Sequence, residues 1–156
     1  MATQTTAHRS PTALGQPRWF FGMLAEVKAS AADTGGQYTL VEVTAPPGLA
    51  SPLHVHYTED EGFYVLEGSA TIVVGDETVE LASGQHAFGP RDVPHKLTVG
   101  PDGARMIWTL TPGGFENLIE DVSVPAETPT VPPPSVRPPE NVAEILRRHG
   151  NELLGG

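Results

Sequence analysis

Two histidines with a single residue between them, followed closely by a glutamate, constrain this chain more than any other feature. His54 and His56 form the pair, and Glu61 follows five positions after the second histidine. Alternate side chains of a β-strand project to the same face, so a strand here directs both imidazoles into one space. A turn through residues 57–60 and a new strand at Glu61 return the carboxylate to that space. Further along the chain, His95 is the natural fourth member of this group.

Imidazole nitrogens and a carboxylate around one point suit a divalent first-row transition metal. We therefore expect one metal ion, and Fe, Mn, Ni, Co, Cu and Zn all accept such ligands. Three imidazoles and one carboxylate leave two octahedral positions open, as a catalytic metal requires. The expected metal ligands are His54, His56, Glu61 and His95.

Two glycine-bounded motifs contain these residues. Residues 48–68 fit G-x5-H-x-H-x4-E-x6-G, and residues 84–95 fit G-x5-P-x-[G/D]-x2-H. On these motifs the chain resembles a single-domain cupin over residues 36–111. The resemblance implies an all-β fold, a jelly-roll β-barrel (double-stranded β-helix) with the metal inside it. Asp92 and Val99 depart from the common pattern, but Asp tolerates positive φ in a turn and neither is a ligand position.

Three nearby side chains need separate interpretation. Glu59 and Asp60 are alternative carboxylate ligands, but the residues that follow fit the motif best when Glu61 is the ligand. We therefore expect neutral substitutions of Glu59 and Asp60 to have little effect. His86 lies inside the second motif, and we expect it to be a partly exposed side chain on the outer face of a short strand.

Short β-branched and apolar runs separated by Gly and Pro predict many short strands. Strands are expected at residues 18–30, 37–44, 63–66, 70–74, 78–81, 95–99 and 104–110, with a further short one ending at Phe88. Turns are expected at residues 67–69, 75–76, 90–94 and 101–103. One or two short C-terminal helices follow, because apolar residues recur at helical spacing near residues 115–122 and 141–149.

The chain is expected to have four parts. Residues 1–17 are a mobile N-terminal segment, and residues 18–124 form the barrel with its following short helix. Residues 125–139 contain seven prolines, which predicts an extended segment laid along the barrel or bridging to a partner subunit. Residues 140–156 form an amphipathic helix and a tail. Exposed rings at residues 19–21 are costly in water, so we expect a homodimer that covers them.

Charge and composition exclude several partners. The net charge is −10 and only two residues are lysines, which argues against nucleic acid and anionic membranes. No apolar run reaches spanning length and the N-terminus lacks the apolar core of a signal peptide, so we expect a soluble cytoplasmic protein. The chain has no cysteine, which removes thiolate metal sites.

Strand alternation predicts an apolar, aromatic pocket beside the metal, suited to a flat hydrophobic small molecule. No group of Arg or Lys converges on the motifs, which disfavours a phosphorylated substrate. The expected lining residues are Phe63, Val65, Leu97, Val99, Met106, Trp108 and Leu110.

Among cupins, the pattern is most similar to small bacterial quercetin 2,3-dioxygenase-like proteins. This resemblance implies a metal-dependent dioxygenase acting on a flavonol-like or other enolisable aromatic compound. Glu61 would then be both a metal ligand and the catalytic base. The alternatives are a non-redox metal cupin, such as a cyclase, isomerase or dehydratase of secondary metabolism, and a small-molecule-binding cupin without turnover.

Overall fold

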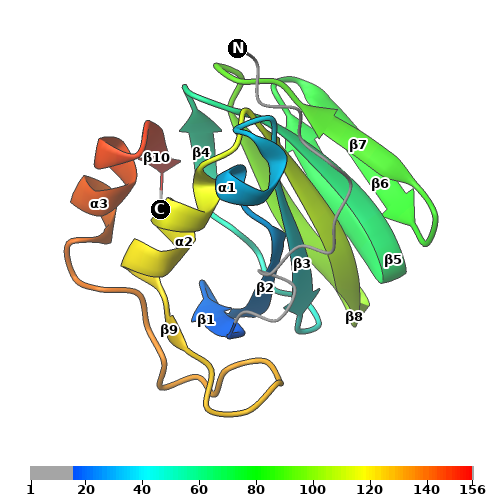
Figure 1. Cartoon of the computed structure of the whole chain (residues 1–156). Helices are drawn as coiled ribbons and strands as arrows, with labels where there is room; N and C mark the ends of the chain where they lie inside the picture. The colour runs from blue at the N-terminus through cyan, green and yellow to red at the C-terminus, as the bar shows by residue number, and fades with distance from the viewer. Residues whose placement is uncertain (1–15, 156) are drawn as a thin grey trace.

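The computed structural model describes residues 16–155, which form one antiparallel sheet network with helices at its margin (Figure 1). Residues 1–15 of the segment predicted to be mobile lie outside the described residues. The strands are β1 (Arg18–Phe20), β2 (Met23–Ala29), β3 (Thr39–Ala45), β4 (Leu53–His56), β5 (Asp60–Val74), β6 (Glu77–Ala82), β7 (His86–Gly89), β8 (His95–Thr111), β9 (Val124–Pro125) and β10 (Asn151–Gly155). The helices are α1 (Ala31–Thr34), α2 (Phe115–Val122) and α3 (Val142–Arg148).

The predicted all-β class is confirmed, and β3 shows its physical basis. Val41, Val43 and Ala45 are buried, while the residues between them are partly exposed. This period of two gives the strand one face toward the core and one toward solvent. β3 pairs with β2 on one side and with β8 on the other. The core cluster contains buried residues of β1, β2, β3, β5 and β8, and also of α2 and α3.

The expected turns at residues 67–69 and 101–103 are wrong, because β5 and β8 continue through them. The two strands pair along most of their length, with a register shift between Gly68 and Ala70. Gly68 and Gly103 both have a φ of 79° and lie against each other. The turn residues therefore bend two paired strands at the same level, as bulges do, instead of ending them.

We expect Gly68→Ala to lower the free energy of unfolding by at least about 3 kcal/mol, because left-handed strain adds to a clash. A Cβ at Gly68 would lie 1.9 Å from the carbonyl oxygen of Gly103. Gly48→Ala is the matched control, since its φ is 72° but nothing lies within 4 Å of an added Cβ. The control should cost only about 1 kcal/mol from backbone strain. Equal losses for both variants in chemical denaturation would contradict the close approach of β5 and β8.

The N-terminal region differs from the single strand expected at residues 18–30. It forms the hairpin β1–β2, with a turn at Phe21 and Gly22 that have positive φ. Trp19 and Phe20 are buried within the chain, and the indole nitrogen of Trp19 donates a hydrogen bond to the carbonyl of Thr130 at 2.8 Å. The proline-rich segment thus lies along the N-terminal hairpin. Two of the three rings behind the expected homodimer are thus buried within one chain, while Phe21 is only partly buried, and the homodimer stays a prediction.

Both expected C-terminal helices are present, but the strand after them was missed. α2 buries four apolar residues and α3 buries Ile145 and Leu146. β10 then pairs antiparallel with β4, placing Asn151 opposite His56 and Leu153 opposite His54. Figure 1 shows α2, α3 and β10 on the same side of the molecule as β4, away from β6 and β7. None of the helices within residues 16–155 has the length and hydropathy needed to cross a membrane.

Candidate metal centre

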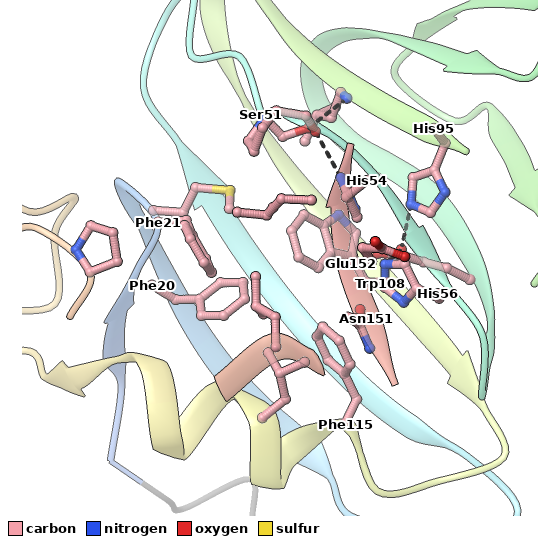
Figure 2. Close-up of a pocket in the computed structure, with 18 of the residues that line it drawn as sticks. Phe20, Phe21, Ser51, His54, His56, His95, Trp108, Phe115, Asn151 and Glu152 are labelled. Carbon is pink, nitrogen blue, oxygen red and sulfur yellow. Dashed lines mark hydrogen bonds and ion pairs between the residues drawn. The ribbon is translucent and has the colours of Figure 1, made fainter. Parts of the chain in front are cut away.

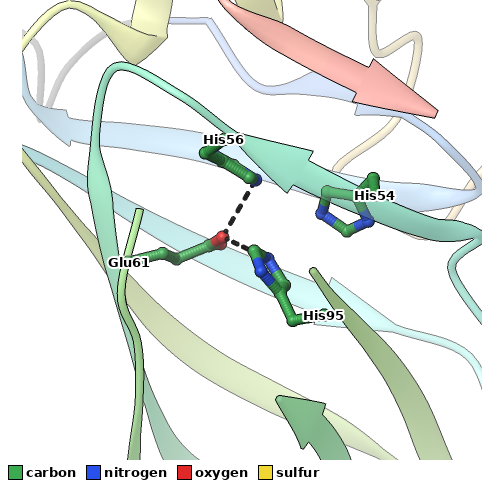
Figure 3. Close-up of side chains that lie close together, drawn as sticks. All are labelled: His54, His56, Glu61 and His95. Atoms are coloured by element: carbon green, nitrogen blue, oxygen red, sulfur yellow. Dashed lines mark hydrogen bonds and ion pairs between the residues drawn. The ribbon is translucent and has the colours of Figure 1, made fainter. Parts of the chain in front are cut away.

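Side chains from three strands converge on one point in the core (Figure 3). His54 and His56 come from β4, Glu61 from the start of β5, and His95 from the start of β8. Alternation along β4 and the short turn before β5 place them together, as expected from their spacing. One ligand atom from each of the four residues lies within 4.8 Å of the others. Three of the side chains are buried and that of His54 is half-buried.

Each imidazole presents its Nδ1 to an acceptor outside the cluster. His54 Nδ1 donates to the carbonyl of Pro52 at 2.8 Å, and His95 Nδ1 lies 3.4 Å from the carbonyl of Val93. His56 Nδ1 donates to the carboxylate of Glu59 at 2.9 Å. A carbonyl or carboxylate only accepts, so these contacts favour the tautomer with the proton on Nδ1, which directs Nε2 toward the centre.

Two of the three Nε2 atoms lie beside the carboxylate of Glu61. The Oε2 atom of Glu61 lies 3.3 Å from His56 Nε2 and 3.1 Å from His95 Nε2 (Figure 3). Burial acts to raise the pKa of Glu61, but the neighbouring histidines, His56 foremost, outweigh it and lower this pKa. Burial and the adjacent His95 lower the pKa of His54 to about 4. The cluster therefore combines a carboxylate held as an anion with a neutral imidazole.

Burial also acts on His56, in the direction that lowers its pKa. The carboxylates of Glu61 and Glu59 outweigh this effect and raise the pKa of His56. Its ring additionally packs face to face with Phe115 of α2, with centroids 5.7 Å apart. The ring of His56 is thus fixed by packing against Phe115 of α2 and by its hydrogen bond to Glu59.

This donor set fits a divalent transition metal. Three imidazole nitrogens and one carboxylate oxygen are ligands of intermediate character, suited to such ions and not to a thiolate-bound structural zinc. Metal–ligand bonds are about 2.0–2.2 Å long, so ligands on opposite sides of an ion stand about 4 Å apart. The observed spread is close to that value, and a cation would take the place of protons that the imidazoles share with Glu61. The four residues can therefore hold a metal ion, whose identity the donor set leaves open.

A cavity of about 280 Å³ opens onto the cluster (Figure 2). Of the residues expected to line a pocket, Phe63, Leu97 and Trp108 do so. The structure buries the other expected residues in the core and not in this lining; they are Val65, Val99, Met106 and Leu110. Beside the cavity, the indole Nε1 of Trp108 is the one buried side-chain polar atom without a hydrogen-bond partner among the described residues.

Much of the cavity wall comes from segments to which the sequence assigned no pocket residue. The N-terminal hairpin contributes Phe20 and Met23, and α2 contributes Phe115. The C-terminal region contributes Leu146 and Asn151. Figure 2 shows Phe20 and Phe21 on the side of the cavity away from His54 and His95. Strand alternation around the motifs could not find these residues, because they reach the site through long-range packing.

The remaining four residues considered in or near the motifs lie in different settings. Glu59 is buried beside His56 and accepts a hydrogen bond from it, a setting that the sequence did not indicate. Asp60 pairs at the surface with Arg91, at 3.2 Å. His86 is exposed on β7, as expected. Asp92 has a φ of 69°, which confirms that this position needs a residue that tolerates the left-handed region.

Comparison with known proteins gives consistent similarities. The family model described as "Cupin domain" matches residues 41–110. Quercetin 2,3-dioxygenase of Bacillus subtilis is 30% identical over 117 residues, which are 74% of this chain and 35% of that protein. Quercetin 2,3-dioxygenase of Aspergillus japonicus is 33% identical over 92 residues, or 54% of this chain and 26% of that protein. The chain thus spans about a third or less of the length of these two relatives.

Solved structures agree with this assignment at the level of the fold. An RmlC-like cupin from Shewanella frigidimarina superposes with a TM-score of 0.57 at 18% identity, covering 73% of this chain and 99% of that chain. At this identity the match shows a shared fold and says nothing about activity. The chain therefore carries a cupin domain over residues 41–110, and all four clustered side chains lie within it.

Proposed function

We propose that this protein is a metal-dependent cupin dioxygenase acting on a flavonol-like or other enolisable aromatic small molecule. The observation that carries the proposal is the position of the histidine–glutamate cluster at one side of an apolar, aromatic cavity. The similarity to two quercetin 2,3-dioxygenases supports oxygenase chemistry. Among the described residues lining the cavity, none is Lys or Arg, which disfavours phosphorylated and other multiply anionic substrates.

A bound divalent metal would supply Lewis acidity to a substrate hydroxyl, as well as redox activity where the ion allows it. Glu61 is the residue placed to accept the proton of that hydroxyl, because its carboxylate is ionised and faces the cavity. Phe63 and Trp108 form an edge-to-face pair 6.1 Å apart in the lining and can position a flat ring. The apolar walls exclude water from the proton-transfer site.

Oxygen consumption is the direct test of this function. Protein loaded separately with Fe, Mn, Co, Ni, Cu or Zn should consume dioxygen when quercetin is added, with at least one of these metals. The same preparations under strict anaerobiosis should leave quercetin unchanged. Anaerobic turnover of an enolisable substrate would instead favour the non-redox cupin activities. Metal-loaded protein that binds such compounds and turns over none of them, with or without dioxygen, would contradict an enzymatic role.

A further inference from the structure

Glu59 occupies a buried position with three hydrogen-bond partners. Its Oε1 accepts from His56 Nδ1 at 2.9 Å and from Asn151 Nδ2 at 3.0 Å, and its Oε2 accepts from the hydroxyl of Thr58. The side chain of Asn151 also donates to the carbonyl of His149 at 3.1 Å. Burial acts to raise the pKa of Glu59, but its hydrogen bonds with His56, Thr58 and Asn151 lower it. A buried carboxylate is costly without partners, and these three hydrogen bonds offset that cost and fix the side chain in place.

Among the three clustered histidines, His56 differs in what holds its Nδ1. The partners of His54 and His95 are backbone carbonyls, whose positions follow from the path of the chain. The partner of His56 is a charged side chain, which makes the imidazole more basic and fixes its tautomer. The charge of Glu59 can be removed by substitution, so the importance of this contact is open to experiment.

The anchor of Glu59 comes from the far end of the chain. Asn151 and Glu59 are 92 positions apart in the sequence. β10 brings them together by pairing with β4 so that Asn151 stands opposite His56 itself. Asn151 is 4% exposed, and its amide lines the same cavity as the histidines. The C-terminal strand is thus tied to the cluster both through its backbone and through the Glu59 carboxylate.

We propose that Glu59 and Asn151 are positioning residues of the metal centre: Asn151 of β10 holds Glu59, and Glu59 holds His56 with Nε2 toward the metal. In this proposal β10 contributes a residue that positions a metal ligand, although β10 lies outside the matched cupin domain. The inference rests on the metal-binding part of the proposed function and is independent of whether the reaction uses dioxygen.

Cobalt(II) titration of metal-free protein, followed by its visible absorption spectrum, tests this directly. Removing such an outer partner typically costs about 10- to 100-fold in metal affinity. We expect a loss of that size in Glu59→Ala and a smaller loss in Glu59→Gln, whose amide oxygen still accepts from His56. Asn151→Ala should also weaken cobalt binding. The spectrum of each bound variant should shift, because the orientation of one imidazole changes.

Matched controls separate positioning from stability. Asp60→Asn removes the adjacent carboxylate, which is paired with Arg91 at the surface, and Leu154→Ala alters an exposed residue of β10. Both should bind cobalt with the parental affinity and spectrum. If Glu59→Ala and Asn151→Ala were less stable yet bound cobalt as the parent does, the two residues would be merely structural and the inference wrong. A parent protein that binds no cobalt would overturn the metal site as well.

Discussion

The triple variant His54→Ala, His56→Ala, His95→Ala is expected to lose stoichiometric metal binding. Loss of one outer hydrogen-bond partner already costs about 10- to 100-fold in metal affinity, and each of these changes removes a ligand atom itself. Elemental analysis after gel filtration measures the loss. Thermal unfolding provides a second readout, since a metal at 100 times its Kd stabilises the parent by about 2.7 kcal/mol. That stabilisation should be absent from the triple variant.

Two single variants separate loss of metal binding from loss of the fold. The triple variant leaves Glu61 buried without its imidazole partners, a change that destabilises many proteins. His54→Ala avoids this problem, because the His54 ring is hydrogen-bonded to the Pro52 carbonyl and not to Glu61. This variant should still weaken metal binding by more than about 100-fold. His86→Ala, at an exposed position on β7, should bind metal as the parent does. Stoichiometric metal at the same site in the triple variant would end the assignment.

Glu61→Gln is expected to keep the fold and part of the metal but to lower turnover by about 100- to 10,000-fold. Glutamine preserves the size of the side chain and one oxygen ligand, yet its amide does not accept a proton at neutral pH. Steady-state kinetics on the substrate found by oxygen consumption, together with elemental analysis, separates the two effects. A fall in kcat that exceeds the fall in metal content is the expected signature of a lost base.

Asp60→Asn is the appropriate control for Glu61→Gln. Asp60 lies next in sequence but its carboxylate faces Arg91 at the surface. We expect both metal content and turnover of this variant to match the parent. Damage from Asp60→Asn, together with normal turnover of Glu61→Gln, would show that the assigned carboxylate is the wrong one.

The convergence of the four clustered residues could be predicted because it depends on local rules. His54 and His56 share one face of β4 by strand alternation, and a short turn brings Glu61 back beside them. The α2 helix could also be predicted, since its buried residues recur at helical spacing. Asp92 could be identified as a turn residue from its known tolerance of positive φ.

Features that depend on pairing between distant segments could not be predicted. The residues around Gly68 and Gly103 resemble turn signals, and only their contact across two strands shows that they bend a continuous pair. In the sequence, nothing distinguishes Glu59 from a surface acid. Its buried setting includes a hydrogen bond from Asn151, which reaches it only because β10 pairs with β4. No local pattern marks residues 151–155 as a strand, because their structure is imposed by the open edge of β4.

The pairing of β10 with β4 also orders events in time during synthesis. Ribosomes add about 5–20 residues per second, so Asn151 is made roughly 5 to 18 s after Glu59, which lies 92 positions earlier. Throughout the later part of that interval the nascent chain already contains all four clustered residues but lacks the strand that covers Glu59. A ribosome that stopped at residue 150 would release a chain with every proposed ligand and an unsupported His56. On the proposed role of Asn151, the support of His56 through Glu59 is therefore incomplete until β10 has been made.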